Sequence, residues 1–193
     1  MKQKRPTKQS YLKRRYIDRY DKTASIYNLR YYQEQQRKYE TILNFIDKVN
    51  TNSALDLGGG TGLFIRQIIN HSNTIIGVDV SKKMLDEAKK IPDSLTNVYL
   101  IRSDADFLPL KDNLFDIVFA FTILQNMPAP EQTIREIIRV AKTCSTIVLT
   151  AQKRVFEKER FKNMLENEDL HVSKIFDDNE VKDYVAVCEK QRN

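Results

Sequence analysis

The chain has 193 residues, of which 41% are hydrophobic and 30% are charged, a balance typical of one globular domain with a real core. No apolar run approaches the roughly 18 residues of a membrane span, and the N-terminus lacks the apolar stretch of a secretory signal, so we expect a cytoplasmic protein with no membrane partner. Cys144, Cys188, His71 and His171 lack metal-ligand spacing, so we expect no metal site.

The net charge of +6 is concentrated at the N-terminus, where residues 1–15 hold seven basic residues and no acid. Residues 1–10 are predicted to form a disordered basic tail. Basic residues alternate with Tyr11, Tyr16 and Tyr20, a pattern that suits RNA through phosphate pairing and base stacking. The alternative is that the tail only solubilises the chain.

Residues 11–193 are predicted to form a single domain that begins with a helical segment over residues 11–50. This segment is rich in tyrosine, because seven of the nine tyrosines lie between Tyr11 and Tyr39. Its last part, from Tyr31 to Ile46, carries apolar residues at helical spacing. The remaining residues, 51–193, are predicted to form the core of the domain.

Short apolar runs alternate with helical patterns from Ser53 onward. We predict strands at 53–57, 74–78, 97–101, 116–121 and 145–150, and helices near 62–70, 82–90, 131–142 and 155–167. Apolar strands joined by helices indicate an α/β fold, in which a parallel sheet has helices on both faces. Two further strands, 170–176 and 183–188, are joined by a linker too short for a crossover helix, so this last pair is predicted to be antiparallel.

A glycine-rich loop follows the first predicted strand, in the sequence Ala-Leu-Asp-Leu-Gly-Gly-Gly-Thr-Gly of residues 54–62. The second predicted strand ends on Asp79. A strand, a glycine loop, a helix and an acid at the next strand end make up half of a nucleotide-binding site. The dinucleotide fingerprint requires its third glycine at position 63, which is Leu63, so the spacing argues against that cofactor.

These residues and three later motifs resemble the class I S-adenosylmethionine-dependent methyltransferases. Residues 55–62 are similar to the first motif of the family, and Gly77-Val78-Asp79 is similar to the second. Asp104-Ala105 and Phe115-Asp116 resemble the block around the third and fourth strands. Residues 124–128 resemble the segment after the fourth strand in the branch that includes quinone-biosynthesis methyltransferases. The resemblance implies a Rossmann-like sheet of seven strands, mostly parallel with the last strand antiparallel, under an N-terminal helical lid.

The resemblance also implies S-adenosyl-L-methionine as cofactor and assigns its contacts residue by residue. Asp56 would face the amino group of the cofactor, Asp79 would accept both ribose hydroxyls, and Asp104 would take the adenine amino group beside Ala105. The backbone near Phe121 would close the site. The methionine part would lie against three glycines of the loop, Gly58, Gly60 and Gly62.

Catalytic residues are not evident from the sequence, because no general base is recognisable. Gln125 and Asn126 replace the two histidines of the family, and they either line the acceptor pocket or cap the turn before Pro128. Tyr20 and Tyr27 are candidates for the acceptor pocket because the N-terminal segment commonly covers it in this family. Asp106 is expected to be a solvated loop acid.

Three functions remain open from the sequence. The first is methyl transfer to RNA or to a translation-related protein, guided by residues 1–15. The second is methyl transfer to a small or lipid-like acceptor of the quinone type. The third is a non-catalytic module that binds the cofactor and holds a partner. The strand at 97–101 is expected at a sheet edge, where a small activator subunit of the kind known in some relatives would add a strand.

Overall fold

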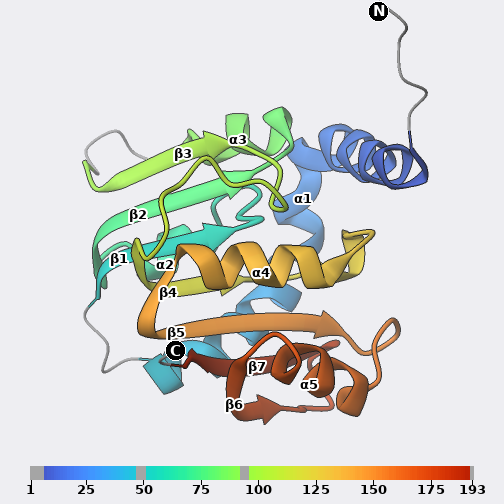
Figure 1. Ribbon diagram of the computed structural model, residues 1–193. Coiled ribbons are helices and arrows are strands. Elements are labelled where there is room, and N and C mark those ends of the chain that lie inside the picture. The colour runs from blue at the N-terminus through green and yellow to red at the C-terminus, as the bar shows by residue number, and fades with distance from the viewer. Residues whose placement is uncertain (1–6, 47–50, 92–95, 192–193) are drawn as a thin grey trace, which may run out of the picture.

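The computed structural model describes residues 7–46, 51–91 and 96–191. Within these ranges the chain forms one seven-stranded sheet in the order β3-β2-β1-β4-β5-β7-β6 (Figure 1). The strands are β1 (Thr51–Leu57), β2 (Ser72–Asp79), β3 (Val98–Arg102), β4 (Phe115–Ala120), β5 (Ala141–Gln152), β6 (Leu170–Phe176) and β7 (Asp183–Lys190). All seven predicted strands are confirmed.

The pairing of the strands confirms the predicted direction of each. β1 to β5 pair in parallel, whereas β7 runs antiparallel to both of its neighbours, β5 and β6. β3 is an edge strand, as expected. Because the chain builds outward from β1 to β3 on one side and through β4 and β5 on the other, the topological switch point lies between β1 and β4.

Helices cover both faces of the sheet. They are α1 (Lys8–Ile46), α2 (Ile65–Ile68), α3 (Lys82–Ala88), α4 (Pro130–Val140) and α5 (Lys158–Glu166), with a short 3₁₀ helix η1 (Leu124–Asn126). Alternate residues of β4 face opposite cores: Phe119 packs with residues of α1 and α2, whereas Val118 packs with α4 and α5. This period of two follows from the strand geometry, so every strand in the middle of the sheet is buried on both faces.

Helix α1 is the longest element, at 39 residues, and it starts earlier than predicted. It begins at Lys8, so residues 8–10 of the segment expected to be disordered are helical, and residues 1–6 lie outside the described part. Thr7 caps the start, because its side-chain oxygen accepts a hydrogen bond from the backbone of Ser10 at 3.2 Å. No glycine or proline interrupts residues 7–46, so a single helix replaces separate segments.

The two halves of α1 have different surroundings. The second half packs on the sheet, where Tyr39 and Ile42 are buried against α2. The first half extends past the tips of the strand arrows, which mark the carboxyl ends of the parallel strands (Figure 1). In parallel sheets ligands bind at this end, so the first half of α1 lies where a lid would lie.

Candidate functional site

The main pocket lies at the carboxyl ends of β1 to β4, with an empty volume of about 790 Å³ including its part open to solvent. Its lining comes from the glycine loop, the end of β2, the loops after β3 and β4, and one stripe of α1. It therefore brings together the predicted residues Asp79, Asp104, Ala105 and Phe121, which come from three different strands.

The glycine loop has a backbone that other residues rarely adopt. Gly58, Gly60 and Gly62 have φ angles of 73°, 55° and 73°, in the left-handed region. A Cβ atom at Gly60 would meet nothing closer than 4.0 Å, so it would occupy the space of the pocket. A Cβ at Gly62 would instead lie 2.8 Å from Ile91 Cδ1. Gly58 and Gly60 therefore line the pocket. The side of Gly62 on which a Cβ would stand faces the region after α3 instead.

Asp79 ends β2 beside this loop and is held by backbone groups. Gly60 N–H donates to Asp79 Oδ2 at 3.0 Å, and Ser81 N–H donates to Asp79 Oδ1 at 2.8 Å. Burial raises the pKa of Asp79, and these two hydrogen bonds oppose the rise. Each carboxylate oxygen has a second acceptor position left, so the side chain can still accept two hydroxyl groups.

Asp56 lies on β1 beneath the loop and is almost fully buried, with 2% of the residue exposed. Its Oδ2 atom has no hydrogen-bond partner among the described residues. Burial, with a smaller contribution from the charge of Asp79, raises the pKa of Asp56 to about 7. Asp56 lines a smaller pocket that shares Tyr27, Gly58 and Gly60 with the main one. Asp56 Oδ2 is thus a buried acceptor without a donor, and a cationic group of a ligand in the pocket would satisfy it.

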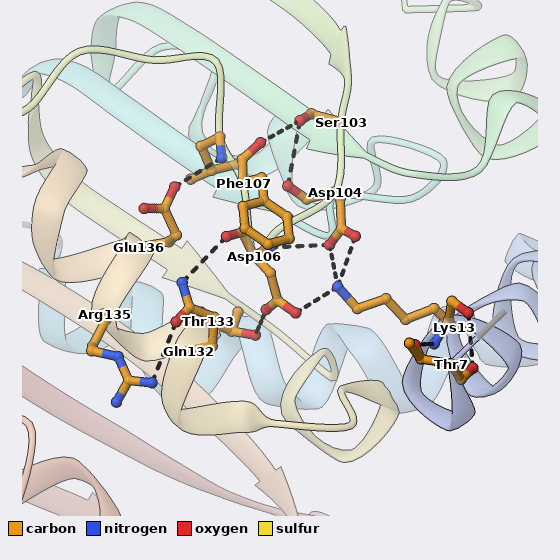
Figure 2. Close-up of polar contacts among 12 residues, drawn as sticks. Thr7, Lys13, Ser103, Asp104, Asp106, Phe107, Gln132, Thr133, Arg135 and Glu136 are labelled. Carbon is orange, nitrogen blue, oxygen red and sulfur yellow. Dashed lines mark hydrogen bonds and ion pairs between the residues drawn. The ribbon is translucent and has the colours of Figure 1, made fainter. Parts of the chain in front are cut away.

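Asp104 follows β3 and is engaged by a residue of α1, as Figure 2 shows. Lys13 Nζ donates to both carboxylate oxygens of Asp104 at 2.7 Å. The same ammonium group lies 2.5 Å from Asp106 Oδ2. Ala105 between the two acids is buried and lines the pocket. The two carboxylates and one ammonium form a cluster that we call the Lys13 cluster.

The expectation for Asp106 was wrong, because this residue is only 6% exposed. Its Oδ1 atom accepts a hydrogen bond from Thr133 Oγ1 of α4 at 2.5 Å, and its Oδ2 pairs with Lys13. The loop after β3 folds back onto α4, which removes Asp106 from solvent. Sequence reasoning missed Lys13 as well, because it precedes Asp106 by 93 residues and no local pattern connects them.

The turn after β4 uses both residues that replace the family histidines. The carbonyl of Thr122 accepts hydrogen bonds from Gln125 Nε2 at 2.7 Å and from Asn126 Nδ2 at 3.0 Å. Thr122 has a φ of 57°, so these bonds support a strained residue. Asn126 also lines the pocket and donates to Tyr20 Oη at 3.0 Å. Gln125 therefore caps the turn, whereas Asn126 both caps the turn and faces the pocket.

Tyr20 and Tyr27 of α1 both line the pocket, together with Lys13, Tyr16 and Ile17 on the same helical face. Burial raises the pKa of Tyr20 and of Tyr27 above that of a free tyrosine. Both hydroxyls therefore stay protonated near neutral pH and cannot serve as general bases there. They can orient a ligand as neutral donors or acceptors.

A buried ion pair behind the pocket also escaped sequence reasoning. Lys38 Nζ lies 2.6 Å from Asp183 Oδ2 and donates to Thr122 Oγ1 at 3.0 Å. It joins α1, the turn after β4 and the start of β7. The signal available from sequence was a lysine in the apolar stripe of a helix, which alone does not identify a partner.

The comparisons with known proteins agree with this geometry. Residues 55–149 match the family model described as a methyltransferase domain. Among solved structures, a putative methyltransferase in complex with the Trm112 methyltransferase activator of Haloferax volcanii has a TM-score of 0.73 at 16% identity, over 90% of this chain and 98% of that one. The N-methyltransferase NodS from Bradyrhizobium japonicum, in complex with S-adenosyl-L-homocysteine, has a TM-score of 0.72 at 14% identity, over 82% and 88% of the two chains.

Residues 55–149 thus carry a methyltransferase domain, and the relatives and structural neighbours support the resemblance to the class I S-adenosylmethionine-dependent methyltransferases and the fold predicted from it. Two similar sequences are demethylmenaquinone methyltransferases. The one from Staphylococcus saprophyticus is 29% identical over 133 residues, 67% of this chain and 56% of that protein. The one from Shouchella clausii is 32% identical over 135 residues, with the same two shares. The chain thus spans little more than half the length of these relatives.

None of the helices in the described part of the chain has the length and apolar character to cross a bilayer. The residues with assigned positions also include no group of three His, Cys, Asp or Glu side chains arranged to hold a metal ion.

Proposed function

We propose that the chain binds S-adenosyl-L-methionine in this pocket and transfers its methyl group to an acceptor. The observation that carries the proposal is the convergence of the left-handed glycine loop, Asp79 and Asp104 on one pocket at the switch point of a class I sheet. This arrangement supplies close backbone approach and two carboxylates at separate strand ends. Asp79 would take the ribose hydroxyls, and Asp104 would take the adenine amino group.

The residues present fit the remaining parts of this cofactor. Asp56 Oδ2 is a buried acceptor without a partner, so an ammonium group of the ligand would satisfy it. Gly60 leaves room where any larger residue would place a Cβ. Bound in this way, the cofactor supplies a methyl group already activated on a sulfonium.

The contribution of the protein to the reaction is positioning. Thr122, Asn126 and Tyr20 form a connected set beside the pocket, and each is held by a hydrogen bond to another member. Holding the acceptor in line with the reacting methyl group can remove several kcal/mol of barrier. The carboxylates at the pocket, Asp56, Asp79 and Asp104, are assigned above to the cofactor, so we infer that none of them takes a proton from the acceptor atom.

We propose a small or lipid-like acceptor in preference to a macromolecule. The lining of the pocket includes apolar side chains such as Ile17, Ile123 and Met127, and α1 contributes Tyr16 and Tyr20 to it. An apolar pocket suits a compact acceptor better than a polymer. The two relatives named demethylmenaquinone methyltransferases support the same class.

RNA or a translation-related protein is the second candidate, supported by the exposed Arg14 and Arg15 at the start of α1. Lys13, which belongs to the same basic run, is occupied by two acids. If RNA is the acceptor, binding to bulk RNA should weaken with salt and be lost when both arginines become alanine.

We also propose β3 as the docking edge for a small activator subunit. Tyr99 on this edge strand is 55% exposed, and Phe107 in the loop that follows is 73% exposed. An edge strand with exposed aromatic residues offers unpaired backbone groups to a partner strand. The structural neighbour in complex with Trm112 supports a partner of this kind. A fully active monomer in size-exclusion chromatography would contradict it.

The function is tested by tritiated methyl transfer to fractionated cell extract, with RNA, protein and small-molecule pools counted separately. Label in the small-molecule or lipid pool is the expected result. Label confined to RNA or protein would select the second candidate. If the chain binds S-adenosylhomocysteine but transfers no label to any pool, it is a non-catalytic cofactor-binding module.

A further inference from the structure

The Lys13 cluster connects the N-terminal part of α1 to the loop that follows β3. Lys13 is one of the pocket-lining residues, and its side chain is 20% exposed. Its ammonium reaches two carboxylates, one of which is the predicted adenine ligand Asp104. The same ammonium lies 5.8 Å from the centre of the Phe107 ring. Three interactions thus converge on one side chain near the beginning of the helix (Figure 2).

Other polar contacts hold α1 further along. Asp21 accepts a hydrogen bond from Ser81 Oγ at 2.5 Å, and Asn28 accepts one from Thr61 Oγ1 at 2.6 Å. Residues 8–20 precede these contacts, and within that stretch Lys13 makes the ion pairs that reach across the pocket. The pocket-facing Tyr16 and Ile17 lie between Lys13 and Asp21. Release of Lys13 would therefore free the turns of α1 that precede Tyr20, whose hydroxyl is held by Asn126.

We propose that Lys13 is a positioning residue of the cofactor site that acts through Asp104 and Asp106 and sets the rate at which the cofactor enters and leaves. The proposal rests on the cofactor site proposed above. The ion pairs hold residues 8–20 over the pocket, and the cofactor enters or leaves when they break. Residues 8–20 thus act as a gate. This gate changes both the association and the dissociation rate of the cofactor, because the same barrier is crossed in both directions.

The acceptor positions of Asp104 allow the gate to close over a bound base. Oδ1 accepts from Lys13 and from the Asp106 backbone N–H, which lies 3.0 Å away. Oδ2 accepts from Lys13 and keeps one further position, which an adenine amino group can use. Lys13 and the base therefore share the carboxylate, and the ion pair exists with or without the ligand.

The test is the exchange rate of S-adenosylhomocysteine measured by surface plasmon resonance in Lys13→Met and in the control Lys22→Met. Methionine keeps the apolar stem of lysine and removes the charge. Lys22 is exposed on the same helix, so its substitution makes the same charge change away from the pocket. We expect Lys13→Met to raise both rates roughly three- to tenfold, the factor for a partly buried ion pair, and Lys22→Met to leave them unchanged.

Salt provides an independent readout. S-adenosylhomocysteine has no net charge near neutral pH, so salt should act mainly on the protein's own ion pairs. Both rates of the wild type should rise with salt, and those of Lys13→Met should not. Equal rates in the wild type and Lys13→Met, or a salt dependence that survives the substitution, would overturn the proposal.

Hydrogen exchange tests the gate without the cofactor. Lys13→Met should speed amide exchange over residues 8–20 and leave residues 28–43 unchanged, whereas Asp106→Asn, which keeps the Asp104 pair, should have an intermediate effect. Unchanged exchange over residues 8–20 would overturn the gate. If calorimetry shows that the wild type does not bind S-adenosylhomocysteine, the proposed function fails, and the exchange experiment still decides whether Lys13 holds the helix.

Discussion

Lys38 Nζ lies 2.6 Å from Asp183 Oδ2, and both side chains are fully buried. This pair joins the middle of α1 to the first residue of β7. Asp183 Oδ1 has no partner among the described residues, so the carboxylate depends on Lys38 for its compensation. The pair holds α1 against the sheet. Lys38 also donates to Thr122, so the same contact connects α1 to the turn after β4.

Replacing Lys38 with methionine should destabilise the protein by about 3–5 kcal/mol, because it leaves a buried carboxylate without a counter-charge. Urea denaturation followed by circular dichroism measures the change. The double variant Lys38→Met/Asp183→Leu should recover most of the loss, since it removes both charges. A single variant as stable as the wild type would show that Asp183 is compensated in another way.

Replacing Asp79 with alanine should weaken binding of S-adenosylhomocysteine by about 2–3 kcal/mol, because two hydroxyl groups lose a charged acceptor. Isothermal titration calorimetry measures the affinity. Asp86→Ala is the matched control, since Asp86 is an acid of α3 that pairs with surface lysines rather than lining the pocket. Equal affinities in Asp79→Ala and the control would remove Asp79 from the site.

Asp56 should make the stability of the protein depend on pH. Its pKa is raised by burial from 3.8 to about 7 in the folded state, so the folded protein binds more protons than the unfolded chain between these values. The free energy of unfolding should therefore contain a contribution that decreases as pH rises from about 4 to 7 and is constant above that range.

The readout for Asp56 is the difference in unfolding free energy between Asp56→Asn and the wild type, measured in urea at pH 5 and at pH 8. The wild type should lose stability between the two pH values as Asp56 ionises, whereas the variant should not, because asparagine does not ionise. The difference should therefore favour the variant more at pH 8. A difference independent of pH would mean that Asp56 does not titrate in this range.

Two glycines of the loop should respond differently to substitution by alanine. Both have left-handed φ angles, so each variant should lose about 1 kcal/mol or more of stability. At Gly60 the added methyl group enters the pocket, and affinity for S-adenosylhomocysteine should fall. At Gly62 it meets Ile91 at 2.8 Å, so stability should fall further while affinity changes little. Calorimetry combined with urea denaturation separates the two effects, and the reverse order would contradict the assignment.

The sequence predicted the sheet because its signals are local. Five of the strands contain a short apolar run bounded by turn residues, and the brief linker 177–182 allows only an antiparallel return of β7. The N-cap of α3 depends on equally local contacts, since the Ser81 side chain accepts the backbone N–H of Met84 three residues later. The start of α1 was missed because basic, polar residues resemble a disordered segment until a cap and a docking surface hold them.

By itself the sequence determined the α/β fold, the glycine loop and the strand-end position of Asp79, because these depend on spacing within one strand–turn–helix unit. Only the tertiary structure decided that Lys13 holds Asp104, 91 residues away, and that Lys38 holds Asp183. A helical pattern indicates which face of α1 is buried, but not where along the sheet the helix docks. The ion pairs of Lys13 and Lys38 depend on that docking, so the position of α1 and the contacts that hold it can be read only from the folded chain.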